Sequence, residues 1–449
     1  MASYIYKADF RMKLHLVSLG CARNSIDSEV MLGRLAKAGW TIEDEPDEAE
    51  VIIVNTCSFI ESAVNESIDT ILELAEFKKK GACKNMIVAG CLPERFREKI
   101  IETLPEVDCF VGTGAFNEIV QAVEKSASIS KCYLPDPGNV QFQGDEKNIR
   151  PASSHSAYIK VAEGCNRHCT YCIIPKLRGK QRSRPLSEII GEAEFLVASG
   201  VKELILVAQD TTSYGKDLSP QETIGYLLEQ IVNISGEIWI RILYGHPESI
   251  DESFIKIVDS HNKICSYFDI PIQHASTSVL KKMGRAYSKD DLYRLFDKIR
   301  SKVPGASLRT TLITGFPGEK EKDFIELLTF IEDIQFDHLG VFIYSDFEDL
   351  PSHKIPDRVS GKKAEERYHR LMSRQMEISL KKNNKLIGKK FDMLVENKIE
   401  ESVFVGRTRY QSPDVDGVTY IHAEGLQSGT FVKIKITDAL EYDFIGDVV

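Results

Sequence analysis

Three cysteines with the spacing CxxxCxxC are the feature that most restricts what this sequence can form. Cys165, Cys169 and Cys172 lie on one short segment that directly follows an apolar run at residues 158–161. Three thiolates on one loop can bind three irons of a 4Fe-4S cubane, for which soft thiolate is the natural ligand. Because a cubane has four irons, the spacing predicts a cluster with one iron left open to another ligand.

Two simpler interpretations of these cysteines are less consistent with the spacing. A structural zinc site needs four closed ligands, usually as paired CxxC units or as CxxC with two histidines. No second cysteine pair follows at that spacing. A disulfide framework is not expected in a long chain that begins without a secretory signal.

A second set of three cysteines follows three predicted strands in the first third of the chain. Strands are predicted at residues 13–20, 51–54 and 85–89, and they are followed by Cys21, Cys57 and Cys91. Helical stretches separate the strands, which favours a parallel α/β, Rossmann-like sheet. The carboxyl ends of parallel strands share one edge, so we expect the three cysteines to converge there.

The alternative for this second set is that the cysteines are small buried hydrophobic residues, which is common for free cysteine. Three repeats of a strand followed by cysteine make that alternative weaker. The other four cysteines follow no such pattern, and we interpret Cys83, Cys109, Cys132 and Cys265 as packing residues.

Alternation of strands and helices resumes at residue 157. Six strands are predicted at residues 157–161, 203–208, 238–243, 267–270, 307–313 and 339–344. Six βα units are too few for a full eight-fold barrel, so a partial (βα)6 barrel is expected. Functional groups should gather at the carboxyl ends of its strands, where Gln209, Gln273 and Gly315 lie.

The last part of the chain changes character. Residues 363–385 form a charged, amphipathic helical connector, and short β-like runs separated by Gly-containing turns follow it. This pattern predicts a small antiparallel β-barrel. The predicted domains are residues 12–133, 157–382 and 383–449, with a Pro-, Gly- and Ser-rich linker at residues 134–156.

Length and composition limit the partners of the chain. Its 449 residues suit about three domains, and no stretch reaches the ~18 apolar residues of a membrane span. We therefore expect a cytoplasmic protein with no membrane partner. The net charge of −10 argues weakly against nucleic acid as the main substrate and suits a basic protein partner.

Motifs along the whole chain resemble one family, the methylthiotransferases of the radical S-adenosylmethionine (SAM) enzymes. Those proteins combine an N-terminal domain with three spaced cysteines, a partial (βα)6 radical SAM barrel and a C-terminal TRAM β-barrel. The closest likeness is to the RimO type. The motifs that carry it are at residues 18–21, 27–33, 55–57, 66–71, 172–179, 208–215 and 271–275.

The resemblance implies two 4Fe-4S clusters and SAM as cofactors. Cys165, Cys169 and Cys172 would hold the cluster that cleaves SAM, and Cys21, Cys57 and Cys91 an auxiliary cluster that carries sulfur. The RimO type methylthiolates the β-carbon of an aspartate in the small-subunit ribosomal protein of the decoding centre (S-twelve), with a flavodoxin- or ferredoxin-type electron donor. Tyr171, Gln209, Gln273 and Gly315 are the residues expected to contact SAM.

Two other functions remain as alternatives. The sister branch methylthiolates isopentenyladenosine in tRNA and typically reads Gly-Gln-Asn-Val-Asn where this chain has Ala-Gln-Asp-Thr-Thr at residues 208–212. Residues 383–449 carry eight Lys or Arg against eleven Asp or Glu, which suits phosphate contacts poorly. A non-catalytic iron-sulfur scaffold, the other alternative, would not cleave SAM.

A basic run lies beside the CxxxCxxC segment. We expect it to be solvated, or to contact an anionic partner or the substrate aspartate. Its members are Arg167, Lys176, Arg178, Lys180, Arg182 and Arg184.

Overall fold

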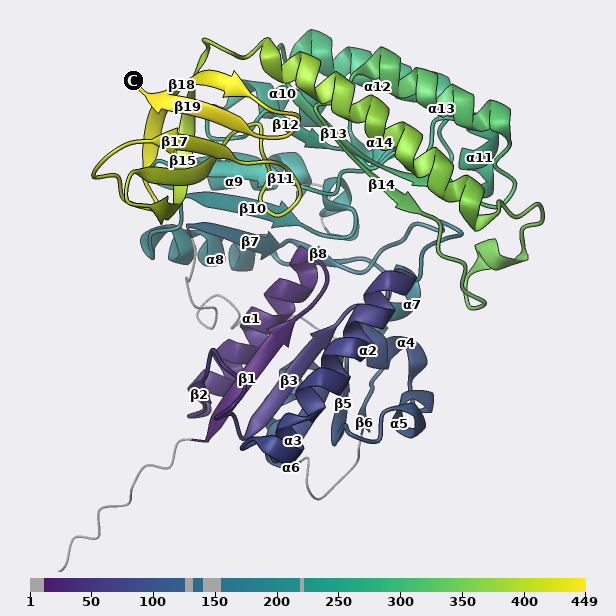
Figure 1. Ribbon diagram of the computed structural model, residues 1–449, viewed down its shortest axis with the longest axis vertical. Coiled ribbons are helices and arrows are strands. Elements are labelled where there is room, and N and C mark those ends of the chain that lie inside the picture. Colours follow the sequence, from purple (N-terminus) through teal and green to yellow (C-terminus); the bar gives the residue numbers. More distant parts are fainter. Residues whose placement is uncertain (1–11, 126–131, 140–154, 219–221) are drawn as a thin grey trace, which may run out of the picture. The chain divides into compact units, whose positions relative to one another are not determined.

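The computed structural model describes residues 12–125, 132–139, 155–218 and 222–449 (Figure 1). They form two compact units. The N-terminal unit contains the described part of residues 1–151 together with Ile173–Lys180, and the barrel unit contains the described part of residues 152–172 and Gln181–Val449. Most of the predicted linker, residues 140–154, lies outside the described residues. No described helix has both the length and the apolar character needed to cross a membrane.

A parallel sheet forms the centre of the N-terminal unit, as the sequence predicts, and it contains six strands. Its strands are β1 (Lys13–Ser18), β2 (Thr41–Ile42), β3 (Val51–Thr56), β4 (Asn85–Gly90), β5 (Cys109–Gly112) and β6 (Cys132–Tyr133). The order β2-β1-β3-β4-β5-β6 is the flavodoxin-like variant of the doubly wound fold. The strand order therefore reverses between β1 and β3, where such sheets bind ligands.

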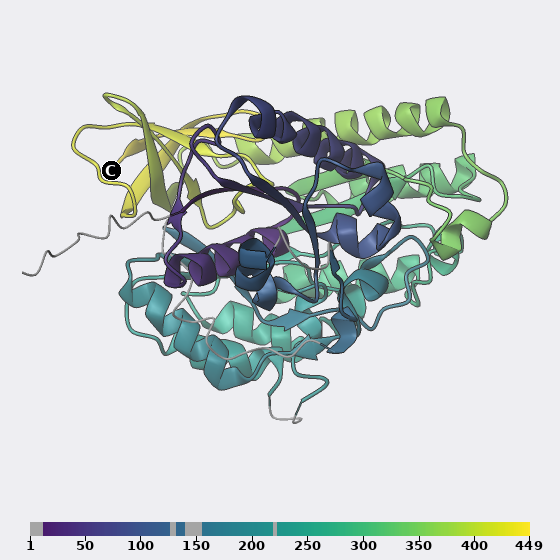
Figure 2. The same cartoon turned by 90° about the horizontal axis from the view of Figure 1, so that it is seen from below.

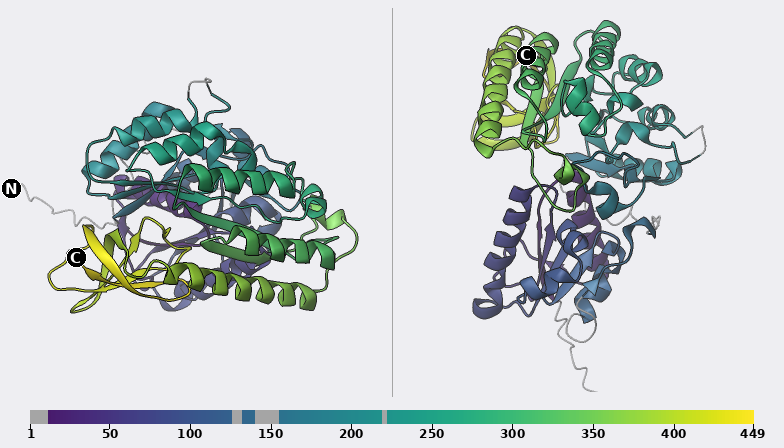
Figure 3. Two further views of the ribbon diagram at one scale, coloured as in Figure 1. Left: turned by 90° about the horizontal axis from the view of Figure 1, so that it is seen from above. Right: turned by 90° about the vertical axis from the view of Figure 1, so that its right-hand side faces the viewer.

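Helices cover both faces of this sheet, as the right-hand view of Figure 3 shows. Side chains of α1 (Ala22–Lys37) and α6 (Ile119–Lys125) pack with the strands in one apolar cluster. The helices α2 (Glu61–Ala75) and α3 (Phe77–Lys80) follow β3. All six side chains of β3 are buried, as expected for a central parallel strand. The sequence did not predict β2 and β6, since two residues are too few to show periodicity.

The barrel unit contains the six predicted parallel strands. They are β7 (Ser156–Lys160), β10 (Glu203–Val207), β11 (Trp239–Ile242), β12 (Tyr267–Asp269), β13 (Ser307–Thr314) and β14 (His338–Ile343). Two three-stranded sheets, β11-β10-β7 and β12-β13-β14, are joined by a parallel bridge between Ile240 and Ile264. The helices that cover them are α8 (Leu186–Ala198), α9 (Ile224–Val232), α10 (Glu252–Ser260), α11 (Thr277–Lys282), α12 (Lys289–Lys302) and α13 (Glu321–Ile334). One continuous apolar core lies between strands and helices.

The connector and the C-terminal barrel complete this unit. The helix α14 (Gly361–Asn384) runs beside β14 to the C-terminal barrel (Figure 2). That closed barrel contains β15 (Lys390–Glu400), β16 (Val403–Thr408), β17 (Thr419–His422), β18 (Phe431–Ala439) and β19 (Phe444–Val448). Its pairs are antiparallel as predicted, except that β17 and β19 are parallel. Five strands cannot alternate in direction around a closed ring, so at least one pair must be parallel.

Candidate metal centres

In the N-terminal unit, Cys21, Cys57 and Cys91 follow three neighbouring strands of the sheet. Cys21 precedes the first residue of α1, Cys57 directly follows β3, and Cys91 begins α4 (Cys91–Phe96) after β4. Thr56 pairs with Gly90 in the sheet, so Cys57 and Cys91 leave adjacent strands at the same level. The structure thus brings the three predicted ligands to one edge, beside the reversal of strand order.

The three thiols are close enough to affect one another electrostatically. Burial raises the pKa of Cys91 to about 12; Cys57 and Cys21 add to this rise, and Arg178 opposes it. Burial would also raise the pKa of Cys21, but Arg23, a backbone hydrogen bond from Asn24 and Arg178 outweigh it and lower this pKa. Metal ligation requires the thiolate, which nearby cations favour.

The cysteines are not arranged around a single point. Among the described residues, no three Cys, His, Asp or Glu side chains are grouped as ligands of one metal ion. In a 4Fe-4S cluster each thiolate binds a different iron, so the ligands need not converge on one point. Three buried or partly buried soft ligands at one sheet edge therefore fit a cluster by donor type and placement.

Two asparagines hold the strand ends that carry these cysteines. The Asn24 side-chain amide donates to the carbonyl oxygens of Leu19 (3.1 Å) and Thr56 (2.9 Å). The Asn55 amide donates to the Asn24 carbonyl at 2.9 Å and to Ser28 Oγ at 2.8 Å. These bonds join the end of β1 to the end of β3. No local pattern marks Asn24, because its acceptor Thr56 lies 32 positions away on β3.

Arg178 reaches the same edge from a distant part of the sequence. It ends α7 (Ile174–Arg178), whose residues belong to the N-terminal unit. Its guanidinium donates to Asp27 Oδ2 (2.6 Å), to Asn24 Oδ1 (2.7 Å) and to Cys91 Sγ (3.8 Å). The side chain is 3% exposed. A hydrogen bond from a cation to a ligand sulfur is an interaction that tunes a cluster.

The prediction that the basic run is solvated is wrong for three of its members. Arg178 is buried, and Arg184, 1% exposed, forms an ion pair with Glu192 at 2.6 Å. Arg167 binds two carboxylates, as described below. Arg178 and Arg167 meet carboxylates from distant parts of the chain, whereas the partner of Arg184 is eight positions further along.

Gly20 provides a test of the auxiliary site. Its φ is +96°, and an added Cβ would lie 2.7 Å from Cys57 Cβ, whereas Gly39 has φ +95° with nothing within 4 Å of such a Cβ. We expect Gly39→Ala to lower the free energy of unfolding by about 1–2 kcal/mol, because it forces a side chain into left-handed backbone. Gly20→Ala should lower it by more, since its Cβ would also overlap Cys57 Cβ. Only Gly20→Ala should also lower the iron bound after anaerobic reconstitution. Equal iron contents in the two variants would contradict the placement of Cys57 as a ligand.

In the barrel unit, two short strands flank the CxxxCxxC loop: β8 (Ala162–Glu163) precedes it and β9 (Arg182–Ser183) follows it in the sequence. The two strands pair antiparallel. The backbone N–H of Thr170 donates to the Met283 carbonyl at 3.0 Å, and its hydroxyl to the Lys282 carbonyl at 2.9 Å. All three cysteines of the loop are partly buried. The C-terminal end of α11 therefore holds the loop from one side.

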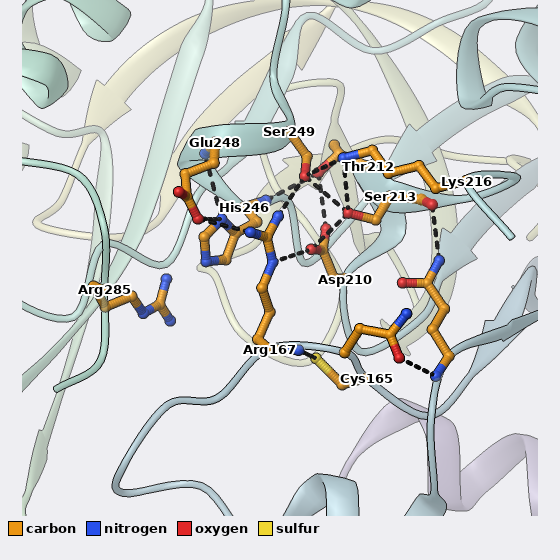
Figure 4. A network of polar contacts seen from close by, with 12 residues as sticks. Cys165, Arg167, Asp210, Thr212, Ser213, Lys216, His246, Glu248, Ser249 and Arg285 are labelled. Atoms are coloured by element: carbon orange, nitrogen blue, oxygen red, sulfur yellow. Dashed lines mark hydrogen bonds and ion pairs between the residues drawn. The ribbon is translucent and has the colours of Figure 1, made fainter. Parts of the chain in front are cut away.

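Arg167 anchors the loop to the barrel strands (Figure 4). Its backbone N–H donates to Cys165 Sγ at 3.4 Å. Its guanidinium contacts Asp210 Oδ2 at 3.0 Å, Glu248 Oε2 at 2.6 Å and Ser249 Oγ at 2.6 Å. Asp210 follows β10, and Glu248 and Ser249 follow β11, so two strand ends fix the position of this part of the loop.

His246 lies in the same network. Burial lowers its pKa to about 2, with Arg285, Arg167 and Lys216 adding to the effect, so the imidazole is neutral at pH 7. Its Nδ1 accepts a hydrogen bond from the Glu248 backbone N–H at 3.3 Å. Its Nε2 is buried and has no partner within the described part of the chain.

The four residues expected to contact SAM lie on the cysteine loop or after barrel strands. The Tyr171 hydroxyl accepts hydrogen bonds from Arg285, and its ring packs edge-on against Phe316 with centroids 6.4 Å apart. The Gln209 side-chain amide donates to Glu163, while its Oε1 is buried without a partner among the described residues. Whether these side chains bind SAM stays a prediction.

Gln273 and Gly315 both have left-handed backbone, with φ of +69° and +78°. Non-glycine residues at positive φ are uncommon and often mark functional sites. At Gly315 the space for a side chain is taken by a helix of the same chain, because an added Cβ would lie 2.6 Å from Ala364 Cβ of α14. Helix packing accounts for this glycine, and its role as a SAM contact stays a prediction.

Comparisons with known proteins agree with this arrangement. Residues 13–112 match the family described as Uncharacterized protein family UPF0004, residues 159–331 the Radical SAM superfamily, and residues 387–449 the TRAM domain. Among solved structures, the chain resembles the radical SAM methyltransferase TsrM from Kitasatospora setae, with a TM-score of 0.55 and 17% identity, over 74% of this chain and 75% of that one. At this identity the likeness concerns the fold alone.

Relatives of known name match along the whole chain. The ribosomal protein uS12 methylthiotransferase RimO of Desulfosudis oleivorans is 51% identical over 438 residues, 97% of this chain and 100% of the relative. The proteins of the same name from Clostridioides difficile and Geobacter sulfurreducens are each 45% identical, over 98% and 97% of this chain and 99% and 98% of the relatives. The chain therefore belongs to the RimO family of radical SAM methylthiotransferases.

Proposed function

We propose that this transferase attaches a methylthio group to the β-carbon of an aspartate in the small-subunit ribosomal protein uS12. The observation that carries the proposal is the presence of two separate three-cysteine sets, one at the edge of each parallel sheet system. Relatives of 45–51% identity bear the name of that activity. An aliphatic C–H bond is not acidic enough for acid–base chemistry, so a cofactor must carry the difficult step.

The six cysteines are the proposed ligands of two 4Fe-4S clusters. Cys165, Cys169 and Cys172 would hold one cluster with SAM, and Cys21, Cys57 and Cys91 the other. When bound, these groups supply reductive cleavage of SAM and sulfur for transfer. The protein residues fix the geometry: Arg167 holds the first loop against the barrel, while Asn24 and Arg178 hold the second site. Tyr171, Gln209, Gln273 and Gly315 remain the proposed SAM contacts.

The charge of the C-terminal barrel favours a protein substrate over tRNA. Its eight Lys or Arg against eleven Asp or Glu from residue 383 onward would attract a basic ribosomal protein. Phosphate contacts would require the opposite charge. A ribosomal substrate also implies that the protein works in the cytoplasm, where a flavodoxin or ferredoxin would supply electrons. The predicted domain boundaries, residues 12–133, 157–382 and 383–449, belong to the same proposal.

Mass spectrometry of a deletion strain tests the substrate. We expect uS12 from the deletion strain to be lighter by one methylthio group, with the increment restored by the wild-type gene and not by a Cys165→Ala gene. Digested tRNA from the same cells should keep its methylthio-isopentenyladenosine. Unchanged uS12 together with loss of the tRNA modification would reverse the assignment.

A further inference from the structure

Arg285 lies directly beside the CxxxCxxC loop. The residue before it, Gly284, has φ +73°, and a Cβ added there would be 2.6 Å from the His168 carbonyl oxygen. Arg285 donates from Nε (3.1 Å) and from Nη2 (2.7 Å) to the hydroxyl of Tyr171, the residue before Cys172. These contacts place a guanidinium at the edge of the proposed SAM-cleaving centre.

The positive charge of Arg285 has no carboxylate partner among the described residues. Its other contacts are the Tyr287 hydroxyl at 2.9 Å and the Pro271 carbonyl at 3.4 Å, both neutral. Six other arginines of the barrel unit each pair with a carboxylate: Arg167, Arg184, Arg241, Arg309, Arg367 and Arg407. Arg285 differs from them in that only neutral oxygens surround it.

Such an arrangement is unfavourable without an anion. Arg285 is partly buried, so its guanidinium has lost part of its hydration, a cost in free energy that neutral hydrogen-bond acceptors return only in part. A guanidinium carries five N–H donors, and the contacts of Arg285 use four. The fifth is on Nη2, so this nitrogen can donate to a ligand without breaking an existing contact.

The neighbouring groups would not compensate the charge. Burial is the main cause that lowers the pKa of His246, and the positive charges of Arg285 and Arg167 lower it further (Figure 4). Glu248 and Asp210 are the nearby carboxylates, and Arg167 binds both of them. Lys216 adds a further cation to the network. The barrel end therefore offers one guanidinium with unmatched charge and one buried acceptor, His246 Nε2.

We propose that Arg285 is a carboxylate-binding residue beside the cluster loop. The carboxylate comes from one of two sources, the methionyl moiety of SAM or the side chain of the substrate aspartate. The inference rests on the proposed function, because that function brings both carboxylates to this centre. Tyr171 and Tyr287 orient the guanidinium, so they are positioning residues.

Binding measurements on anaerobically reconstituted full-length protein test the proposal. The variants are Arg285→Gln, Arg285→Lys and, as a matched control, Arg294→Gln, which removes an exposed arginine in α12 that contacts Asp291. The probes are SAM, decarboxylated SAM, a uS12 loop peptide with its target aspartate and the same peptide with asparagine. We expect Arg285→Gln to raise the Kd of one carboxylate-bearing probe by about 30-fold or more. Its carboxylate-free analogue should bind the variant and the wild type within about two-fold of each other.

The two sources give different results. Weaker binding of SAM but not of decarboxylated SAM identifies the methionyl carboxylate. Weaker binding of the aspartate peptide but not of the asparagine peptide identifies the substrate. Equal affinities of wild type and Arg285→Gln for all four probes, or equal losses for a probe and its analogue, overturn the proposal.

Arg285→Lys keeps the charge but cannot keep both bonds to Tyr171. Arg285→Lys should retain the iron content of the wild type and lose part of the affinity for the carboxylate-bearing probe. The proposal can therefore still be tested if Arg285→Gln binds less iron. Binding requires no turnover. A wild-type protein that binds these probes but yields no methylthioaspartate would refute the proposed function and leave the Arg285 assignment standing.

Discussion

Replacing Cys165, Cys169 and Cys172 by alanine should abolish the formation of 5′-deoxyadenosine, whereas replacing Cys21, Cys57 and Cys91 should leave it in place. Both triple variants should lose methylthiolation of uS12 to background, because the proposed reaction needs both centres and protein side chains cannot supply the radical step. Each variant should retain about half of the iron and sulfide of the wild type, since each keeps one set of thiolate ligands.

These results are measured by iron and sulfide counting, chromatography of the nucleoside product and mass spectrometry of uS12. Cys83→Ala is the matched control, because Cys83 is a buried cysteine of the same unit that follows no strand end. It should bind iron as the wild type does. Fully loaded wild-type protein that contained zinc, or a single cluster, would contradict the assignment of both sets.

Glu203→Gln should cause the largest loss of stability in the barrel unit. Glu203 is fully buried at the start of β10 and contacts Arg241 Nε at 2.7 Å and Arg407 Nη2 at 2.5 Å. Arg407 belongs to β16, so this network joins the (βα)6 barrel to the C-terminal barrel. An amide would leave two buried guanidinium groups with too little negative charge, which costs about 3–5 kcal/mol in the free energy of unfolding. Asp392→Asn, which breaks an exposed pair with Lys433, should cost less than about 1 kcal/mol.

The effect of Glu203→Gln should depend on pH. Burial alone would raise the pKa of Glu203, but Arg407 and Arg241 outweigh it and lower this pKa to about 2. Because the folded pKa lies below the unfolded value of about 4.3, the carboxylate stabilises the fold above that pH. The contribution is lost as pH falls towards 2. Denaturant unfolding should therefore show a stability gap between wild type and variant at pH 7 that narrows below about pH 4; a gap that does not change with pH would contradict the ion-pair explanation.

The sequence predicted the features of the site that depend on residues close together in the chain. The spacing of Cys165, Cys169 and Cys172 is contained in one loop, so it needs no knowledge of the fold. Cys21, Cys57 and Cys91 could be connected because each follows a strand, and parallel strands end at one edge. The six barrel strands and the C-terminal barrel could also be predicted, because hydrophobic periodicity is a property of short stretches of sequence.

Contacts between distant elements could not be predicted in this way. Arg178 and Asn24 are 154 positions apart, yet the guanidinium of one donates to the side chain of the other. Arg285 and Tyr171 are 114 positions apart and meet at the CxxxCxxC loop. The local pattern suggested that the basic residues near the cysteines were solvated, because it could not reveal Asp27 as the partner of Arg178 or Asp210 as the partner of Arg167.

The sequence by itself determined which sulfur ligands the chain carries, in which order its strands and helices occur, and to which family it is similar. The tertiary structure decided the strand order with its reversal between β1 and β3, the parallel closure of β17 against β19, and the charges that surround each cysteine set. The physical reason is the range of the interactions. Periodicity and ligand spacing act within a few residues, whereas ion pairs and buried hydrogen bonds form between side chains that only the packing of the sheets and helices brings together.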